Sequence, residues 1–194
     1  MLLAIDVGNT NTVFSVLEGE EIISEWRCST DGKMTSDQYY IWLQQLFSLE
    51  KILPNQIKRV IISSVVPDAT FNLKLLAKNY FRSKALVIGS SNCKLPLLLK
   101  VDRGVYVGSD RIVNAVAAFK LFGGNTAIVD FGTATTFDVI DHSGSYVGGV
   151  ISPGVDLANK ALPRAAAALP HVEVRKPENV VGTNTIDCMQ SGIY

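Results

Sequence analysis

The chain has 194 residues, with 18 Lys and Arg against 18 Asp and Glu and with 47% hydrophobic residues. This length fits one domain or two small ones, and the apolar share excludes a disordered chain. The zero net charge and the lack of a Lys/Arg cluster argue against general binding to nucleic acid or to a membrane surface. No apolar run approaches the roughly 20 residues of a membrane span, and the N-terminus does not resemble a secretion signal. Three widely spaced cysteines exclude a disulfide framework and a zinc site, so we expect a cytoplasmic α/β protein.

The first part of the chain predicts an antiparallel meander followed by a helix. Three apolar stretches separated by short polar turns are expected as strands: Leu2–Asp6, Thr12–Leu17 and Ile22–Cys28. Thr35 and Gln38 form a capping-box pattern ahead of a helical apolar period that runs to Phe47.

The middle of the chain alternates predicted strands and helices. In order, we expect a buried strand, a helix, a strand, an irregular Pro-interrupted segment and a second helix: Arg59–Val66, Ala69–Tyr80, Lys84–Ile88, Ser90–Tyr106 and Ser109–Phe122. The second helix ends at Gly123-Gly124, as helices commonly do.

The opening pattern of the chain returns after 124 residues. Asp6-Val7-Gly8 aligns with Asp130-Phe131-Gly132, and Thr12 aligns with Thr136. Two ordinary hairpins with a bend glycine could give this likeness by chance. The shared D-x-G register with strands on both sides favours duplication.

The repeat predicts two domains, 1–124 and 125–194. The first copy uses 124 residues, whereas only 65 remain from Asp130 to Tyr194. We therefore expect the second domain to be truncated at its C-terminal end.

An acid at a strand end followed by a Gly/Thr/Asn turn is suited to binding phosphate. Glycine lets the backbone approach closely, amides and Thr hydroxyls donate to phosphate oxygens, and a carboxylate can hold hydrated Mg²⁺. Two such loops would face each other and hold one polyphosphate from both sides. The chain has neither a Walker A loop nor a Rossmann fingerprint.

Two further segments carry alternatives. Gly108-Ser109-Asp110-Arg111 opens a helix, so Ser109 or Asp110 could simply cap it, or Asp110 could serve as a general base with Arg111 as an anion clamp. Gly148–Gly154 is expected to be a glycine-rich turn ahead of a helix over Val155–Ala168, and it could approach a nucleotide or merely turn the chain.

Five segments in order make the chain resemble the type III pantothenate kinases, the Bvg accessory factor family. They are Asp6–Thr10, Gly108–Arg111, Asp130–Thr136, Gly148-Gly149 with Pro153-Gly154, and Gly182–Thr185 with Met189–Gly192. The likeness covers essentially the whole chain. It implies the actin and sugar-kinase superfamily, in which duplicated ribonuclease-H-like α/β domains have mixed sheets flanked by helices.

The resemblance implies ATP-dependent phosphorylation of pantothenate to 4′-phosphopantothenate, the first step of coenzyme A biosynthesis. Asp110 would be the general base, Asp6 would lie near Mg²⁺, and Asp130 would lie at a monovalent cation, K⁺ or NH₄⁺. The implied ATP-binding residues are Asp6, Val7, Gly8, Asn9, Thr10, Asn11, Thr12, Val13 and Thr133. The implied pantothenate-binding residues are Val101, Gly108, Ser109, Asp110, Arg111 and Thr185. The family also implies a homodimer, whereas the neutral net charge argues against nucleic acid or membrane as partners.

The chain departs from the family at two positions. Val101 stands where many members have Tyr, so a ring contact with substrate is not expected, and Ser109 stands where Ala is usual. Two alternatives stay open: a sibling small-molecule or sugar kinase, and a non-catalytic actin-like nucleotide-binding regulator. Transcription regulation is a poor third, because the chain has no helix-turn-helix signature and no basic excess.

Overall fold

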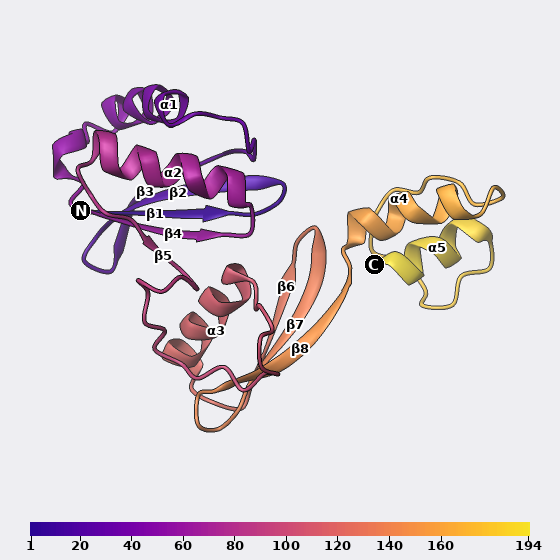
Figure 1. The fold of residues 1–194 in the computed structure, drawn as a ribbon. Coiled ribbons are helices and arrows are strands. Elements are labelled where there is room, and N and C mark those ends of the chain that lie inside the picture. Colours follow the sequence, from indigo (N-terminus) through magenta and orange to yellow (C-terminus); the bar gives the residue numbers. More distant parts are fainter.

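The computed structural model describes residues 1–194, and its first sheet has the mixed topology of the actin-like fold (Figure 1). The strand order is β3-β2-β1-β4-β5. The first three strands are the predicted antiparallel meander, and two parallel strands follow on the other side of β1. Their bounds are β1 Leu2–Val7, β2 Asn11–Glu18, β3 Glu21–Ser29, β4 Arg59–Ser64 and β5 Leu86–Val87. The last two strands are shorter than predicted.

Helices α1 (Ser36–Leu49) and α2 (Pro67–Tyr80) cover one face of this sheet (Figure 1). The predicted capping box is confirmed, since the Gln38 amide donates to Thr35 Oγ1 at 3.3 Å and the Thr35 amide donates to Gln38 Oε1 at 2.8 Å. Alternate strand residues such as Leu3 and Ile5 meet the two helices in a core of 18 buried residues. A short 3₁₀ turn, η1 (Pro54–Gln56), precedes β4.

The opposite face of the first sheet receives α3 (Ser109–Phe122), which also packs on a second, antiparallel sheet. That sheet contains β6 (Thr126–Phe131), β7 (Ala134–Ile140) and β8 (Tyr146–Pro153). Six buried residues of α3, its preceding segment and this sheet form a second core: Val107, Ile112, Ala115, Ala118, Ile140 and Tyr146. Because α3 contacts both sheets, a division of the chain at residue 124 stays a prediction.

Helices α4 (Val155–Ala165) and α5 (Thr185–Ile193) pack as a pair beyond the second sheet, which α4 touches at β7 (Figure 1). The first of these was predicted to reach Ala168, but the backbone becomes extended at Ala166. A small core of Val172, Met189 and Ile193 lies in this part. None of the helices combines the length and the apolar character needed to cross a membrane.

The prediction of a turn at Gly148–Gly154 is wrong, because most of this segment is strand β8. Its register against β7 shifts between Val139 and Ile140, and Gly148 has a φ of 126° beside that shift. The glycine therefore accommodates a β-bulge rather than a reversal of the chain.

The repeated hairpins differ by one residue in the turn. Asp6 pairs with Val13 in the first, whereas Asp130 pairs with Thr136 in the second. The offset is thus 124 before the turn (130 − 6) and 123 after it (136 − 13). The predicted match of Thr12 with Thr136 is accordingly wrong, and the structural counterpart of Thr12 is Thr135.

Candidate active site

The tips of the two repeated hairpins meet, as the repeat predicts. Thr10 Oγ1 and Thr133 Oγ1 lie 2.9 Å apart, although 123 residues separate them in the chain. Each turn is closed by a glycine amide: Gly8 donates to the Asn11 carbonyl at 2.9 Å and Gly132 to the Ala134 carbonyl at 3.0 Å. Two sets of exposed backbone and hydroxyl donors therefore come together at one place.

The first loop is held by side chains that are wholly or partly buried. The Thr30 hydroxyl donates to the Gly8 carbonyl at 2.7 Å and lies 2.9 Å from Thr12 Oγ1. Thr12 and Val7 are buried, whereas Asn9 and Thr10 are exposed. Within the predicted ATP loop, the exposed members can reach a ligand, and the buried ones shape the turn. Thr30 was not identified from the sequence because its partner is a backbone carbonyl distant in the chain.

Of the three acids predicted to serve the reaction, Asp110 and Asp130 both lie close enough to Asp6 to repel its charge. Asp6 lies near the end of β1, Asp110 lies in the first turn of α3, and Asp130 lies near the end of β6. Removal from water raises the pKa of Asp6, a hydrogen bond with Ser63 opposes that rise, and repulsion from Asp110 and Asp130 adds to it. Asp6 is exposed to solvent on one side, yet the surrounding protein makes its ionised form less favourable. The site therefore concentrates negative charge.

Asp130 has one polar partner that the sequence did not suggest. Asn114 Nδ2, one turn beyond Asp110 on α3, donates to Asp130 Oδ2 at 3.0 Å. Because Asn carries no charge, this hydrogen bond orients the carboxylate and leaves its charge in place.

The start of α3 is attached to the first sheet. Its N-cap is Gly108, without a side-chain cap, so neither Ser109 nor Asp110 caps the helix in the predicted way. Ser109 is buried, and its hydroxyl oxygen accepts a hydrogen bond from the Ser63 hydroxyl of β4 at 3.3 Å. Asp110 Oδ1 accepts the Arg111 amide at 2.8 Å. A side chain on Gly108 would collide with this carboxylate, so glycine lets Asp110 lie over the helix start.

The Arg111 guanidinium is engaged by a buried acid. Its Nη2 and Nε donate to Asp138 Oδ1 at 2.6 and 2.8 Å, and Tyr146 Oη donates to the same oxygen at 2.7 Å. Asp138 is fully buried. Burial lowers the pKa of Arg111, but the hydrogen bond and charge of Asp138 outweigh it and raise the pKa overall. Burial first, and then the bond to Asp138, raise the pKa of Tyr146.

This pairing changes the expected part of Arg111. Most of its guanidinium already neutralises Asp138, so the role of anion clamp stays a prediction that would use its remaining N–H donors. The sequence offered one signal for Asp138: a lone acid in the apolar strand Phe137-Asp138-Val139 needs a buried partner. Gly149 lies against both charged groups, and an added Cβ would fall 2.6 Å from Arg111 Nη2.

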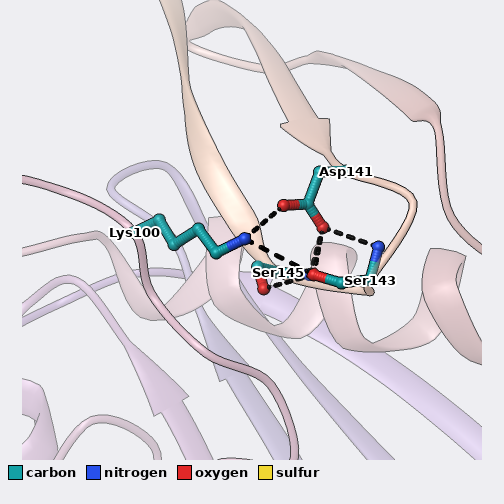
Figure 2. A network of polar contacts seen from close by, with 4 residues as sticks. All are labelled: Lys100, Asp141, Ser143 and Ser145. Atoms are coloured by element: carbon teal, nitrogen blue, oxygen red, sulfur yellow. Dashed lines mark hydrogen bonds and ion pairs between the residues drawn. The ribbon is translucent and has the colours of Figure 1, made fainter.

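The segment that leads to α3 is fixed by a polar network (Figure 2). Lys100 Nζ pairs with Asp141 Oδ2 at 2.6 Å, and Asp141 Oδ1 accepts the hydroxyl and amide of Ser143. The hydrogen bond from Lys100 and those from the turn residues lower the pKa of Asp141. Backbone contact continues from the Lys100 amide to the Tyr146 carbonyl at 2.8 Å. The adjoining Val101 is half-buried and packs on the second core.

The structure does not bring Thr185 to the other predicted substrate residues. It begins α5, in the helix pair beyond the second sheet in Figure 1, and it lines a hollow of about 650 Å³ formed by α4, α5 and their connection. Its predicted contact with pantothenate stays untested.

The acidic site fits a cation that shares its ligands with a bound substrate. No group of three or more His, Cys, Asp or Glu side chains is arranged to hold a metal ion by itself. The three carboxylates are nevertheless hard oxygen donors, and a cation would relieve the repulsion that Asp110 and Asp130 exert on Asp6. Mg²⁺ typically takes one or two protein carboxylates together with substrate phosphates.

Comparison with known proteins identifies the family. The sequence profile described as type III pantothenate kinase matches residues 2–194. The chain belongs to the type III pantothenate kinases. As a member, it is an ATP-using transferase of coenzyme A biosynthesis with pantothenate and ATP as substrates. The match favours this function over the two alternatives left open by the sequence.

Curated relatives agree over the full chain. The type III pantothenate kinase of Roseobacter denitrificans is 57% identical over 194 residues, and that of Cereibacter sphaeroides is 55% identical. Each alignment covers 100% of this chain and 75% of the relative.

Solved structures agree on the fold. A conserved Baf family protein from Campylobacter jejuni superposes with a TM-score of 0.56 at 19% identity, covering 98% of this chain and 72% of its own. A protein from Sinorhizobium meliloti, named as a 2-dehydro-3-deoxygalactonokinase, has a TM-score of 0.51 at 13% identity. The superposition covers 87% of this chain and 57% of that protein. At these identities the likeness concerns the actin-like fold alone, and the type III pantothenate kinase assignment stands on the sequence matches.

Proposed function

We propose that Asp110 is the general base for phosphoryl transfer from ATP to pantothenate. Its carboxylate would accept the proton of the pantothenate hydroxyl as that oxygen attacks the γ-phosphorus of ATP and ADP leaves. The observation that carries this proposal is the proximity of Asp110 to Asp6, at the place where the two loops meet.

We propose that the two loops bind the ATP phosphates. Exposed Asn9, Thr10 and Asn11 on one side and Thr133 on the other can donate to phosphate oxygens, and the Gly8 turn allows close approach. Asp6 would hold Mg²⁺ and Asp130 a monovalent cation, K⁺ or NH₄⁺. Such cations, when bound, offset the negative charge of the phosphates.

We further propose that pantothenate lies along the start of α3. Gly108, Asp110 and the free donors of Arg111 would contact it, and Val101 would border it from the fixed loop. Ser109 would act through the backbone, because its hydroxyl is buried against Ser63. Contact with Thr185 would require another arrangement of α5 or a second protomer, and the family resemblance implies a homodimer. The three cysteines are free, which suits our expectation of a cytosolic enzyme.

The test is Asp110→Asn in the full-length enzyme. We expect turnover to fall by about 10²–10⁴-fold with the Kd for ATP changed less than about threefold, because a base is lost and the phosphate loops are kept. Asp102→Asn, an exposed acid in the preceding segment, is the matched control and should keep full turnover. Normal turnover at saturating ATP with weakened ATP binding would mean that Asp110 serves the nucleotide and another group takes the proton.

A further inference from the structure

A second hollow with a distinct chemistry lies beside α2, outside the candidate active site. It has a volume of about 790 Å³, which is within the range of small-molecule sites. It is formed by α2 from Thr70 onward, the segment that follows this helix, β5 and the residues after β5. None of the residues proposed above for ATP, cation or pantothenate lines it.

Four cationic side chains and no acidic one line this hollow, which we call the basic groove. They are Lys74, Lys78, Arg82 and Lys84, and none of the four forms an ion pair. The whole chain has zero net charge, so this is a local excess of positive charge. The expectation that the chain lacks a Lys/Arg cluster is wrong here, and the stretch Lys74–Lys84 without an intervening acid was the available signal.

The arrangement of these cations does not favour folding. Lys74 and Lys78 are four residues apart on α2, a spacing at which like charges destabilise a helix by a few tenths of a kcal/mol. Arg82 follows the helix with a left-handed φ of 52°, in a place where glycine would be less strained. Neither feature gains a stabilising partner within the chain. A bound anion would supply one.

The groove also offers an apolar surface between its charges. Phe71 is 63% exposed, and Leu75 and Val87 line the same wall. An exposed ring beside cations suits a ligand that has both an aromatic or apolar portion and a phosphate. Ser90 and Asn92 are already hydrogen-bonded to the backbone at Val87 and Ala85, so they shape the wall.

We propose that the basic groove binds a small phosphorylated molecule with an aromatic or apolar portion, at a site separate from catalysis. Phosphate oxygens would accept charge-assisted hydrogen bonds from Lys78, Lys84 and their neighbours on the rim, and the apolar portion would pack on Phe71. This inference does not depend on the role proposed for Asp110.

The test measures binding of two probes, adenosine 3′,5′-bisphosphate and inorganic pyrophosphate, to the full-length enzyme by calorimetry. We expect the double variant Lys78→Gln with Lys84→Gln to weaken both by about tenfold or more, since each removed cation deletes charge-assisted bonds. The matched double variant Lys33→Gln with Lys58→Gln removes the same charge from exposed positions outside the groove and should bind as wild type. Both double variants should keep kcat and KM for ATP.

A further variant, Phe71→Ser, tests the apolar part. It should weaken the bisphosphate severalfold and leave pyrophosphate unchanged. Equal affinities in wild type and in both double variants would overturn the proposal, because the probes would then occupy only the catalytic loops. A Kd weaker than about 1 mM for both probes would also overturn the proposal, because such affinities are typical of weak, unspecific contacts. So would binding of a heparin fragment or an acidic peptide, but of neither probe, with the same dependence on Lys78 and Lys84.

Discussion

Replacement of Asp138 tests whether a buried charge pair stabilises the attachment of α3 to the second sheet. Asp138→Asn keeps the shape of the side chain and an oxygen acceptor but removes the charge. Its Oδ1 accepts from Arg111 Nε, Arg111 Nη2 and Tyr146 Oη, so the change leaves a largely buried guanidinium without a counter-charge. The Arg111 side chain is 17% exposed and that of Asp138 is fully buried.

The expected cost follows from this burial. Loss of one partner of a buried ion pair typically costs about 3–5 kcal/mol. The limited water access of Arg111 and the remaining oxygen acceptor favour the lower end, about 3 kcal/mol. That is a large part of the 5–15 kcal/mol by which domains are usually stable.

The assay is urea unfolding of the full-length enzyme at pH 7, followed by circular dichroism. Glu20→Gln is the control, because Glu20 pairs with Lys120 at the similar distance of 2.8 Å but both side chains are mostly exposed. We expect the control to unfold with the wild-type midpoint. If Asp138→Asn is no more destabilising than Glu20→Gln, then the pair is not formed in solution and the assigned function of Arg111 must change.

Three further outcomes follow from the site. The pKa of Asp6 is raised in the folded state, so its ionisation opposes folding as pH rises through that folded pKa. In urea unfolding, Asp6→Asn should therefore be more stable than wild type at pH 7, and this advantage should be lost below pH ~4. The same variant should lose ATP-dependent turnover. Gly149→Ala should destabilise the folded protein by about 1–3 kcal/mol, because its Cβ would collide with the Phe137 carbonyl of β7 and with the buried ion pair. Gly192→Ala, with open space around it in α5, should be neutral or slightly stabilising. Equal melting temperatures for the two variants would contradict both expectations. Thr10→Val and Thr133→Val should each raise KM for ATP, and a double-mutant cycle should show that their effects on KM are coupled. Fully additive effects on KM would mean that the two hydroxyls do not act together.

Local patterns predicted most of the fold. The capping box at Thr35, the alternating apolar residues of the first strands and the apolar period of α3 each report on neighbours a few residues away, and the structure follows them. The Gly148 segment was misjudged because glycine marks turns and bulges alike. Only the partner strand β7 determines which one forms.

The site was predicted unevenly for a related reason. The D-x-G repeat located Asp6 and Asp130 because the duplicated hairpins carry their chemistry within a few residues. Thr30, Asn114 and Asp138 were missed, since each acts on a group from another element through one hydrogen bond or ion pair. Such contacts depend on how distant elements pack together, and no characteristic spacing of residues in the sequence marks them.

The first turn of α3 connects the two sheets. Ser109 bonds it to β4 of the first sheet, and Arg111 bonds it to β7 of the second. Asp110 lies between these two attachments, so its position depends on both halves of the molecule at once. The acid proposed to take the proton is therefore oriented by its two neighbours in α3, and Ser63 of β4 also forms a hydrogen bond with Asp6. A change in the attachment to β7, which does not involve Asp6, should alter kcat more than the affinity for ATP.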